Sequence, residues 1–278
     1  LVDSRRNQFF RPISYFLMWS TQLAYAVENW RREHGSDVSQ WLTAVGEIEA
    51  LCALAGFAYE HPNYPFPEIV EKGPVLQAEE LRHPLLPSGQ CVPNTIKFDG
   101  KLQLFVVSGS NMSGKSTLLR TVGVNVALAL SGAPVCARRM RLSPMNIGAT
   151  LRIQDSLQTG TSRFYAEIQR LRQIVDLTAG PLPLLFLLDE ILHGTNSHDR
   201  AIGAEAILHA LIDQGAIGLV TTHDLALAHA AEALAPRAVN VHFEDHLEDG
   251  KMSFDYQLRP GVVRKSNALE LMRAVGLK

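Results

Sequence analysis

Residues 109–116 have the spacing of a phosphate-binding P-loop, with a glycine at each end of the loop and a lysine and a serine directly after it. In chain order they are Gly109, Ser110, Asn111, Met112, Ser113, Gly114, Lys115 and Ser116, followed by Thr117. Glycines let successive backbone N–H groups turn towards phosphate oxygens, and the start of a helix adds a partial positive charge there. The spacing predicts that Lys115 reaches the terminal phosphates of a nucleotide and that the Ser116 hydroxyl ligates Mg²⁺.

Two acids close the apolar run from Leu184 to Leu188. Such a run is typical of a buried parallel strand, whose carboxyl end is where α/β sheets place ligands. We therefore expect Asp189 to hold Mg²⁺, directly or through water, and Glu190 to polarise the water that attacks a terminal phosphate. An acidic pair is ordinary by itself, but after a P-loop in this order it favours nucleotide hydrolysis.

A histidine follows the next apolar run, in the sequence Thr221-Thr222-His223-Asp224. At this place His223 is expected to reach the terminal phosphate and to report its presence. Thr222 and Asp224 are also good N-caps for a helix that begins at Leu225, and the capping role does not exclude the catalytic one.

A second anion-binding helix start is expected within residues 155–167, where glycine and small hydroxyl residues precede a helical pattern. The pattern alone favours a Ser-capped surface helix. The position of this segment between the P-loop and the acidic strand favours an anion-binding site instead. In dimeric ATPases with nucleotide between the subunits, such a helix end contacts the partner's nucleotide. The expected contacts are Gly160, Thr161 and Ser162.

An α/β framework is needed to position these residues, and the chain from Pro74 onward has its pattern of short apolar runs alternating with amphipathic stretches. Expected strands are 75–77, 95–98, 102–107, 147–153, 184–188, 217–221 and 238–242. Expected helices are 115–130, 162–177, 197–214 and 225–235. A hairpin is expected to pair 241–243 with 252–256 through residues 248–251.

The first 60 residues have a different pattern. Residues 12–30 and 38–58 show helical apolar spacing on either side of Gly35-Ser36-Asp37, which is expected to break the helix and cap the next one. Their Trp and Leu stripe predicts a packing arm whose apolar face is core. The proline-rich stretch 61–67 cannot be regular structure, so we expect one domain over 1–60 and another over 61–278.

Composition is that of a soluble globular protein, with 46% hydrophobic and 19% charged residues. The formal net charge of −2 provides no global attraction to nucleic acid. A local patch, Arg138-Arg139-Met140-Arg141, could contact DNA, although a solvated charge run is the favoured interpretation. The three cysteines have no metal or redox spacing and indicate reduced thiols. No apolar run reaches the ~18 residues of a membrane span. We expect a cytoplasmic protein with no membrane segment.

Taken in order, these motifs resemble the ATPase domain of the MutS family of DNA mismatch repair proteins, a branch of the ABC-type ATPases. The similarity extends from about Asp37 to Lys278. It is carried by Gly109–Thr117 with Asn111-Met112 inside, Asp155–Glu167, Asp189-Glu190-Ile191, Thr221-Thr222-His223 and Lys265-Ser266. The resemblance implies a P-loop NTPase fold of ABC-ATPase type, with a mixed sheet flanked by helices. The small helical arm before it is similar to the end of the family's lever helix.

The resemblance also implies ATP and Mg²⁺ as cofactors. Val92-Pro93-Asn94 is similar to the family segment that lies against the adenine, and Gly109–Thr117 to the loop that binds the triphosphate. It further implies a homodimer with composite ATP sites and contact with DNA through the parent protein.

Two departures separate this chain from typical relatives. Arg163 stands where many of them have Thr, and Leu192-His193 replaces a more usual Gly-Arg. The roughly 60 residues before the boundary are too few for one typical domain, so we expect no counterpart of the family's mismatch-reading domain among them.

Two functions therefore stay open. One is Mg²⁺-dependent ATP hydrolysis coupled to dimer rearrangement on DNA. The other is a nucleotide-gated dimeric switch without mismatch recognition, including in a membrane-associated parent protein. A transporter ATPase is set aside, because residues 176–183 lack the Leu-Ser-Gly-Gly-Gln-like signature it would need.

Overall fold

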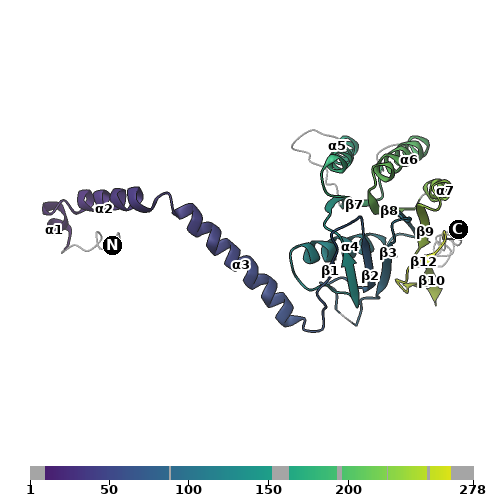
Figure 1. Ribbon diagram of the computed structural model, residues 1–278, viewed down its shortest axis with the longest axis horizontal. Helices are drawn as coiled ribbons and strands as arrows, with labels where there is room; N and C mark the ends of the chain where they lie inside the picture. Colours follow the sequence, from purple (N-terminus) through teal and green to yellow (C-terminus); the bar gives the residue numbers. More distant parts are fainter. Residues whose placement is uncertain are drawn as a thin grey trace. The chain divides into compact units, whose positions relative to one another are not determined.

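The computed structural model describes residues 10–87, 89–151, 163–192, 196–223, 225–248 and 251–263. The chain divides into two compact units, Leu1–Glu60 and His61–Lys278. Helices make up the first unit, whereas the second combines helices with a six-stranded sheet, a four-stranded sheet and a hairpin (Figure 1).

The first unit contains α1 (Phe10–Phe16), α2 (Trp19–His34) and α3 (Val38–Glu60). The sequence predicts one helix over residues 12–30, but Met18 has a φ of 47° and separates α1 from α2. No described residue of α2 or α3 is buried, so the prediction that their stripe is core is wrong for this chain. Within the first unit, the Trp30 and Trp41 rings contact each other, with centroids 6.2 Å apart.

Helix α3 is long and apolar enough to be a candidate membrane span, which the sequence analysis does not identify. Its 23 residues include an 18-residue window with a mean hydropathy of 1.4, none of it buried. Glu47 and Glu49 interrupt the apolar run, which is why inspection of uninterrupted runs misses it. Length and composition define a candidate and not a location, because core helices of soluble proteins have the same properties.

A six-stranded sheet with the order β12-β9-β4-β8-β7-β6 is the centre of the second unit. Its strands are β4 (Leu104–Ser108), β6 (Asn146–Thr150), β7 (Leu184–Asp189), β8 (Ile217–Thr222), β9 (Ala238–His242) and β12 (Arg259–Pro260). All neighbours pair in parallel except β12, which is antiparallel to β9. The predicted mixed α/β architecture is confirmed. Because the strands are parallel, their carboxyl ends meet at one edge of the sheet.

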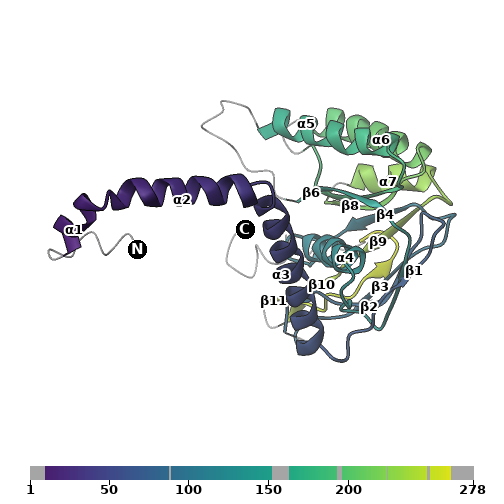
Figure 2. The same ribbon diagram turned by 60° about the vertical axis from the view of Figure 1, so that its left-hand side comes forward.

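Helices cover both faces of this sheet (Figure 2). They are α4 (Lys115–Leu130), α5 (Arg163–Asp176), α6 (Ser197–Asp213) and α7 (Leu225–Ala233), with a short 3₁₀ turn, η2 (Leu177–Ala179), after α5. All four α-helices lie within two residues of their predicted bounds. Helix α4 lies on one face, and α5, α6 and α7 lie together on the other.

The four-stranded sheet has the order β1-β5-β2-β3. Its strands are β1 (Glu68–Ile69), β2 (Leu76–Leu81), β3 (Asn94–Phe98) and β5 (Arg139–Leu142). The sequence did not predict β1 or β5. The arginine-rich run forms β5 because its side chains alternate, with Met140 and Leu142 buried and Arg139 exposed.

The predicted hairpin exists with a different first strand. Its strands are β10 (Asp245–Glu248) and β11 (Lys251–Phe254). The predicted first strand, 241–243, is wrong because Val241 and His242 belong to β9 and pair with β4. Val241 and Phe243 are both buried, so this segment is held by the central sheet and not by a surface hairpin.

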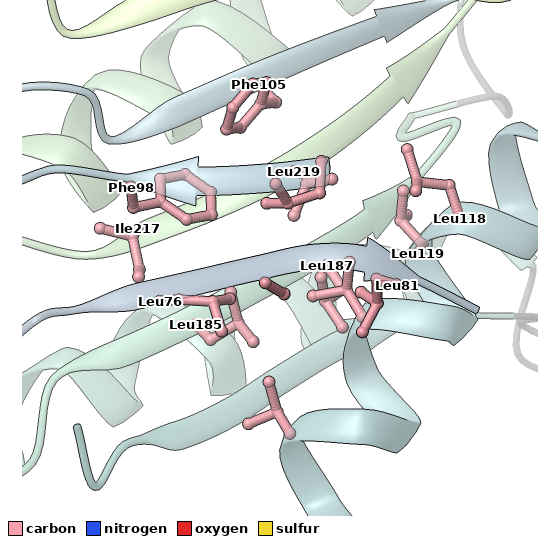
Figure 3. Close-up of a cluster of buried hydrophobic side chains, with 14 of the residues drawn as sticks. Leu76, Leu81, Phe98, Phe105, Leu118, Leu119, Leu185, Leu187, Ile217 and Leu219 are labelled. Atoms are coloured by element: carbon pink, nitrogen blue, oxygen red, sulfur yellow. The ribbon is translucent and has the colours of Figure 1, made fainter. Parts of the chain in front are cut away.

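Two hydrophobic clusters lie on opposite faces of the central sheet, and successive residues of a strand alternate between them. Leu185, Leu187 and Leu219 join a cluster with α4 and the four-stranded sheet, as Figure 3 shows with Leu118 and Phe98. Phe186 and Leu188 join the cluster with α5, α6 and α7. Burial on both faces fixes the register of the strands. The register in turn determines which residues stand at the carboxyl ends of the strands.

Candidate functional site

The loop between β4 and α4 contains residues 109–114 and is shaped by its two glycines. Gly109 has a φ of +151° and Gly114 a φ of +102°. A Cβ at Gly109 would lie 2.7 Å from Ser113 Oγ and 3.1 Å from the backbone oxygen of Phe243. A side chain is therefore excluded at Gly109, and the loop can turn tightly around a small anionic group.

Lys115 opens α4 directly after the loop and is buried, with 5% of its surface exposed. Its Nζ donates hydrogen bonds to the carbonyl oxygens of Gly109 at 2.9 Å and Ser110 at 2.8 Å. The same Nζ lies 3.5 Å from Glu190 Oε1. Burial lowers the pKa of Lys115, and the nearby carboxylate of Glu190 partly offsets that effect. Lys115 thus holds the loop through these two hydrogen bonds, and its ammonium group is largely shielded from solvent.

Ser116 and Asp189 lie side by side at the carboxyl ends of the strands. Ser116 Oγ donates to Asp189 Oδ1 at 3.0 Å, and Thr221 Oγ1 donates to the same oxygen at 2.7 Å. The backbone N–H of Asp189 donates to Thr150 Oγ1 at 3.1 Å, which fixes the end of β7 against β6. These hydrogen bonds hold the carboxylate in one orientation.

This donor set suits magnesium, which prefers oxygen ligands and retains several waters. In the described part of the chain, no group of three or more His, Cys, Asp or Glu side chains is placed to hold a metal ion. Ser116 Oγ and Asp189 Oδ1 would therefore contribute two ligands, and the remainder would come from phosphate and water.

Glu190 lies between Lys115 and His223. Its Oε1 is 3.5 Å from Lys115 Nζ and 3.5 Å from His223 Nδ1. Its backbone N–H donates to Thr221, to Oγ1 at 3.0 Å and to the carbonyl oxygen at 3.3 Å. Parallel pairing of β7 with β8 places Asp189 opposite Thr221 and so brings the acids and the histidine together.

The loop, the acids and α4 line a cleft of about 740 Å³, a volume typical of sites for small organic ligands. Of the residues predicted from the sequence, those that line it are Val92, Asn94, Asn111, Met112, Gly114, Lys115, Ser116, Thr117, Asp189 and Glu190. His223 lines a smaller adjoining cavity that shares Glu190. Pro93, Gly109, Ser110 and Ser113 do not line the cleft. Gly160, Thr161 and Ser162 lie outside the described residues.

Sequence reasoning missed several residues of the cleft, and Tyr256 is the largest. Its φ is +54°, and its ring carbon Cδ1 lies 3.1 Å from the position a Cβ would occupy on Gly114. Asn94 holds this segment in place, because its Nδ2 donates to the Tyr256 carbonyl at 3.0 Å and its Oδ1 accepts from the Leu258 N–H at 2.8 Å. The contact joins residues 162 apart in the chain, and no local pattern predicts it.

Two other missed residues of the cleft are Cys91 and Glu167. Cys91 stands next to the predicted Val92, and its Sγ accepts a hydrogen bond from the His83 N–H at 3.3 Å. Glu167 closes the motif 155–167 and belongs to the predicted helix 162–177, but the sequence analysis does not place it in the cleft, because an acid on an amphipathic helix is ordinarily a solvated residue.

The arginine-rich run is paired with acids and does not form an open basic patch. Arg138 contacts Glu79 Oε2 at 2.5 Å and Glu80 Oε1 at 3.0 Å, and Arg139 contacts Glu68 Oε2 at 3.3 Å. The arginines are exposed, in line with the interpretation of the run as a solvated one.

Comparison with known proteins gives one family. Residues 105–278 match the family described as MutS domain V. Relatives include endonuclease MutS2 of Thermus thermophilus, 33% identical over 70% of this chain and 25% of its own length. DNA mismatch repair protein MutS of Natronomonas pharaonis is 32% identical over 86% of this chain and 28% of its own length. DNA mismatch repair protein MutS 2 of Halobacterium salinarum is 32% identical over 88% of this chain and 29% of its own length. The chain thus spans less than a third of the length of each of these relatives.

Proposed function

The chain belongs to the MutS family of DNA mismatch repair proteins, and from that premise we propose that its second unit is a P-loop ATPase. It binds ATP together with Mg²⁺ and hydrolyses the terminal phosphate. The observation that carries the proposal is the meeting of Lys115, the Ser116–Asp189 pair and Glu190 in a single cleft.

The lining of the cleft suits both parts of a nucleotide. Lys115 supplies a buried ammonium and Ser116 a hydroxyl, both suited to phosphate and its metal. Val92, Asn94 and Tyr256 supply an apolar surface, an amide and an aromatic ring, which suit a nucleobase. A nucleoside triphosphate would use both sets of groups at once.

Each acid has a distinct role in this proposal. Asp189, with Ser116, holds Mg²⁺, which when bound neutralises charge on the phosphate oxygens. Glu190 orients the attacking water and takes its proton at a carboxylate oxygen. His223, whose Nδ1 is 3.5 Å from Glu190 Oε1, senses the terminal phosphate and steadies that carboxylate.

The decisive variant is Glu190→Gln, which keeps the size of the side chain and removes its basicity. We expect binding of a fluorescent ATP analogue within about threefold of the unaltered chain, and phosphate release at least about 100-fold slower, the scale of a lost general base. Glu205→Gln, on the exposed side of α6, is the matched control and should leave both unchanged. Undiminished hydrolysis in Glu190→Gln would refute the role of Glu190, and an unaltered chain that binds no ATP would refute the proposal itself.

We further propose that the ATP cycle drives rearrangement of a homodimer linked to DNA. The segment Gly160–Ser162 would complete the partner's site. DNA contact would come through the rest of the parent protein, because the chain has a net charge of −2 and its arginine run is paired with Glu68, Glu79 and Glu80.

The same charge pairing favours a second candidate, a nucleotide-gated dimeric switch without mismatch recognition. The two differ in their affinity for DNA. Binding to homoduplex and mismatched DNA, measured across a series of salt concentrations, separates them. Affinity that falls steeply with salt and is higher for the mismatch supports the repair function, whereas absent or salt-insensitive binding supports the switch.

A further inference from the structure

The cleft contains a buried carboxylate to which the proposed chemistry assigns no role. Glu167, on α5, is only 5% exposed and lines the cleft. Its Oε1 accepts a hydrogen bond from the backbone N–H of Leu192 at 2.5 Å. A buried carboxylate is costly to desolvate unless it is hydrogen-bonded. Its contact with Leu192 therefore identifies the part of the protein on which Glu167 acts.

That part is the turn directly after β7, which carries Glu190. Glu190 has a φ of +48° and Leu192 a φ of +59°. The left-handed region is unfavourable for residues with a Cβ and persists only where the surroundings determine it. Two such residues within three positions mark a turn that would relax if its restraints were removed.

Restraints act on both sides of the turn. At its start, the Glu190 N–H is bonded to Thr221 of β8. At its end, the Leu192 N–H is bonded to Glu167 of α5. Between them Ile191 is 4% exposed and Leu192 is 5% exposed, both within the cluster shared with α6 and α7. Thr221 belongs to the central sheet, whereas Glu167 restrains the turn from α5 by a hydrogen bond to its backbone.

We propose that Glu167 is a positioning residue that couples α5 to the reactive carboxylate. Its hydrogen bond to the Leu192 N–H holds residues 190–192 in their left-handed turn and thereby aims the Glu190 side chain at the cleft. A displacement of α5 is transmitted through this bond to Glu190, so hydrolysis depends on the position of the helix while nucleotide binding does not. This inference rests on the proposed ATPase function.

The test compares Glu167→Ala, which removes the acceptor, with Glu167→Gln, whose amide oxygen still accepts from the N–H. For Glu167→Ala we expect kcat to fall at least about tenfold with KM for ATP and affinity for the ATP analogue within about threefold, the signature of a misplaced catalytic group. Glu167→Gln should retain at least about a third of kcat, because the hydrogen bond and not the charge positions the turn.

A structural control is available at Ser143, directly after β5 of the four-stranded sheet. Ser143 is 1% exposed, and its Oγ accepts from the Val75 N–H at 3.2 Å. Ser143→Ala therefore also deprives a backbone N–H of its side-chain acceptor, and it should lower the melting temperature while leaving kcat within about twofold. If Glu167→Ala does not fold, Glu167→Asp, shorter by one methylene, takes its place with an expected loss of several-fold in kcat and unchanged binding.

The outcomes separate the two proposals. An unaltered chain that binds ATP but never hydrolyses it overturns the proposed ATPase, and this inference with it. An active unaltered chain overturns this inference alone if Glu167→Ala keeps its kcat, if Glu167→Gln loses as much as Glu167→Ala, or if Ser143→Ala loses as much kcat. A kcat-specific loss in Glu167→Ala that Glu167→Gln restores supports it.

Discussion

Helix α3 of the first unit and helix α4 of the second unit have similar apolar spacing, but their apolar side chains are exposed in α3 and buried in α4. In α3 Trp41, Leu42 and Val45 are 48%, 68% and 53% exposed. In α4 Leu118, Leu119 and Val122 are 4%, 0% and 0% exposed. The difference lies in what each helix has to pack against, since α4 covers one face of the central sheet and α3 has no sheet in its own unit. Apolar spacing predicts a helix, and burial requires a second surface.

The largest effect should come from the core of the second unit. Phe186 on β7 is 0% exposed and packs with α5, α6 and α7, whereas Trp41 in α3 is 48% exposed. Phe186→Ala should lower the free energy of unfolding by about 3–5 kcal/mol through lost burial and a cavity. Trp41→Ala should change it by about 0.5 kcal/mol or less, as for other surface positions. Urea unfolding followed by circular dichroism measures both, and similar losses would contradict the comparison.

Much of the second unit could be predicted because its signals are local. The fully apolar run ending in Asp189 predicts a buried parallel strand, and α4 begins at the predicted Lys115. β5 was missed because three arginines hide the alternation of Met140 and Leu142. The hairpin was misplaced because 241–243 has strand propensity without any sign of which sheet it joins. Which strands pair depends on contacts between distant residues, and a single sequence does not encode that visibly.

The candidate site likewise has one part that can be predicted from the sequence and another that cannot. The groups suited to phosphate come from consecutive residues, 109–117, and from the carboxyl ends of β7 and β8 in the same sheet, so their spacing is visible in the sequence. The groups suited to a base include Tyr256, held by Asn94 across 162 positions. Glu167 stands in the motif 155–167, but its hydrogen bond with the Leu192 N–H could not be predicted, because the two residues are 25 positions apart in the chain. Tertiary partners were therefore the missing information in both cases.

The second unit contains a buried charged group, Lys115, whose contribution to ATP affinity should depend on pH. Burial lowers the pKa of Lys115 below the ordinary lysine value of 10.5. The charged ammonium attracts phosphate, and ATP binding raises the pKa again. The contribution to affinity is therefore complete below the pKa of the free protein, and it is lost as pH rises through the pKa of the complex.

We accordingly expect ATP affinity to begin falling at a pH below 10.5 and to drop by about tenfold or more once Lys115 is neutral, the scale of a hydrogen bond to a charged group. Titration of the ATP analogue from pH 7 upwards measures this. Lys115→Arg keeps its charge throughout and should give a weaker but flatter profile. An equal decline in both proteins would assign the pH dependence to another group.

The smallest effect should come from removing the arm. Every buried hydrophobic residue of the described chain lies at or beyond Leu76, so deleting residues 1–60 removes none of the core. The melting temperature of the second unit should stay within about 2 °C, because a larger shift would require roughly 1 kcal/mol of stabilisation from the arm. Affinity for the ATP analogue should also be unchanged, while binding of an apolar dye should fall, since Trp30, Trp41 and Leu42 are exposed side chains of the arm. A drop of 10 °C or more, or loss of nucleotide binding, would mean that the arm and the second unit fold as one cooperative body. The exposed stripe of α3 would then be part of a core, and the contrast between the two helices would no longer hold.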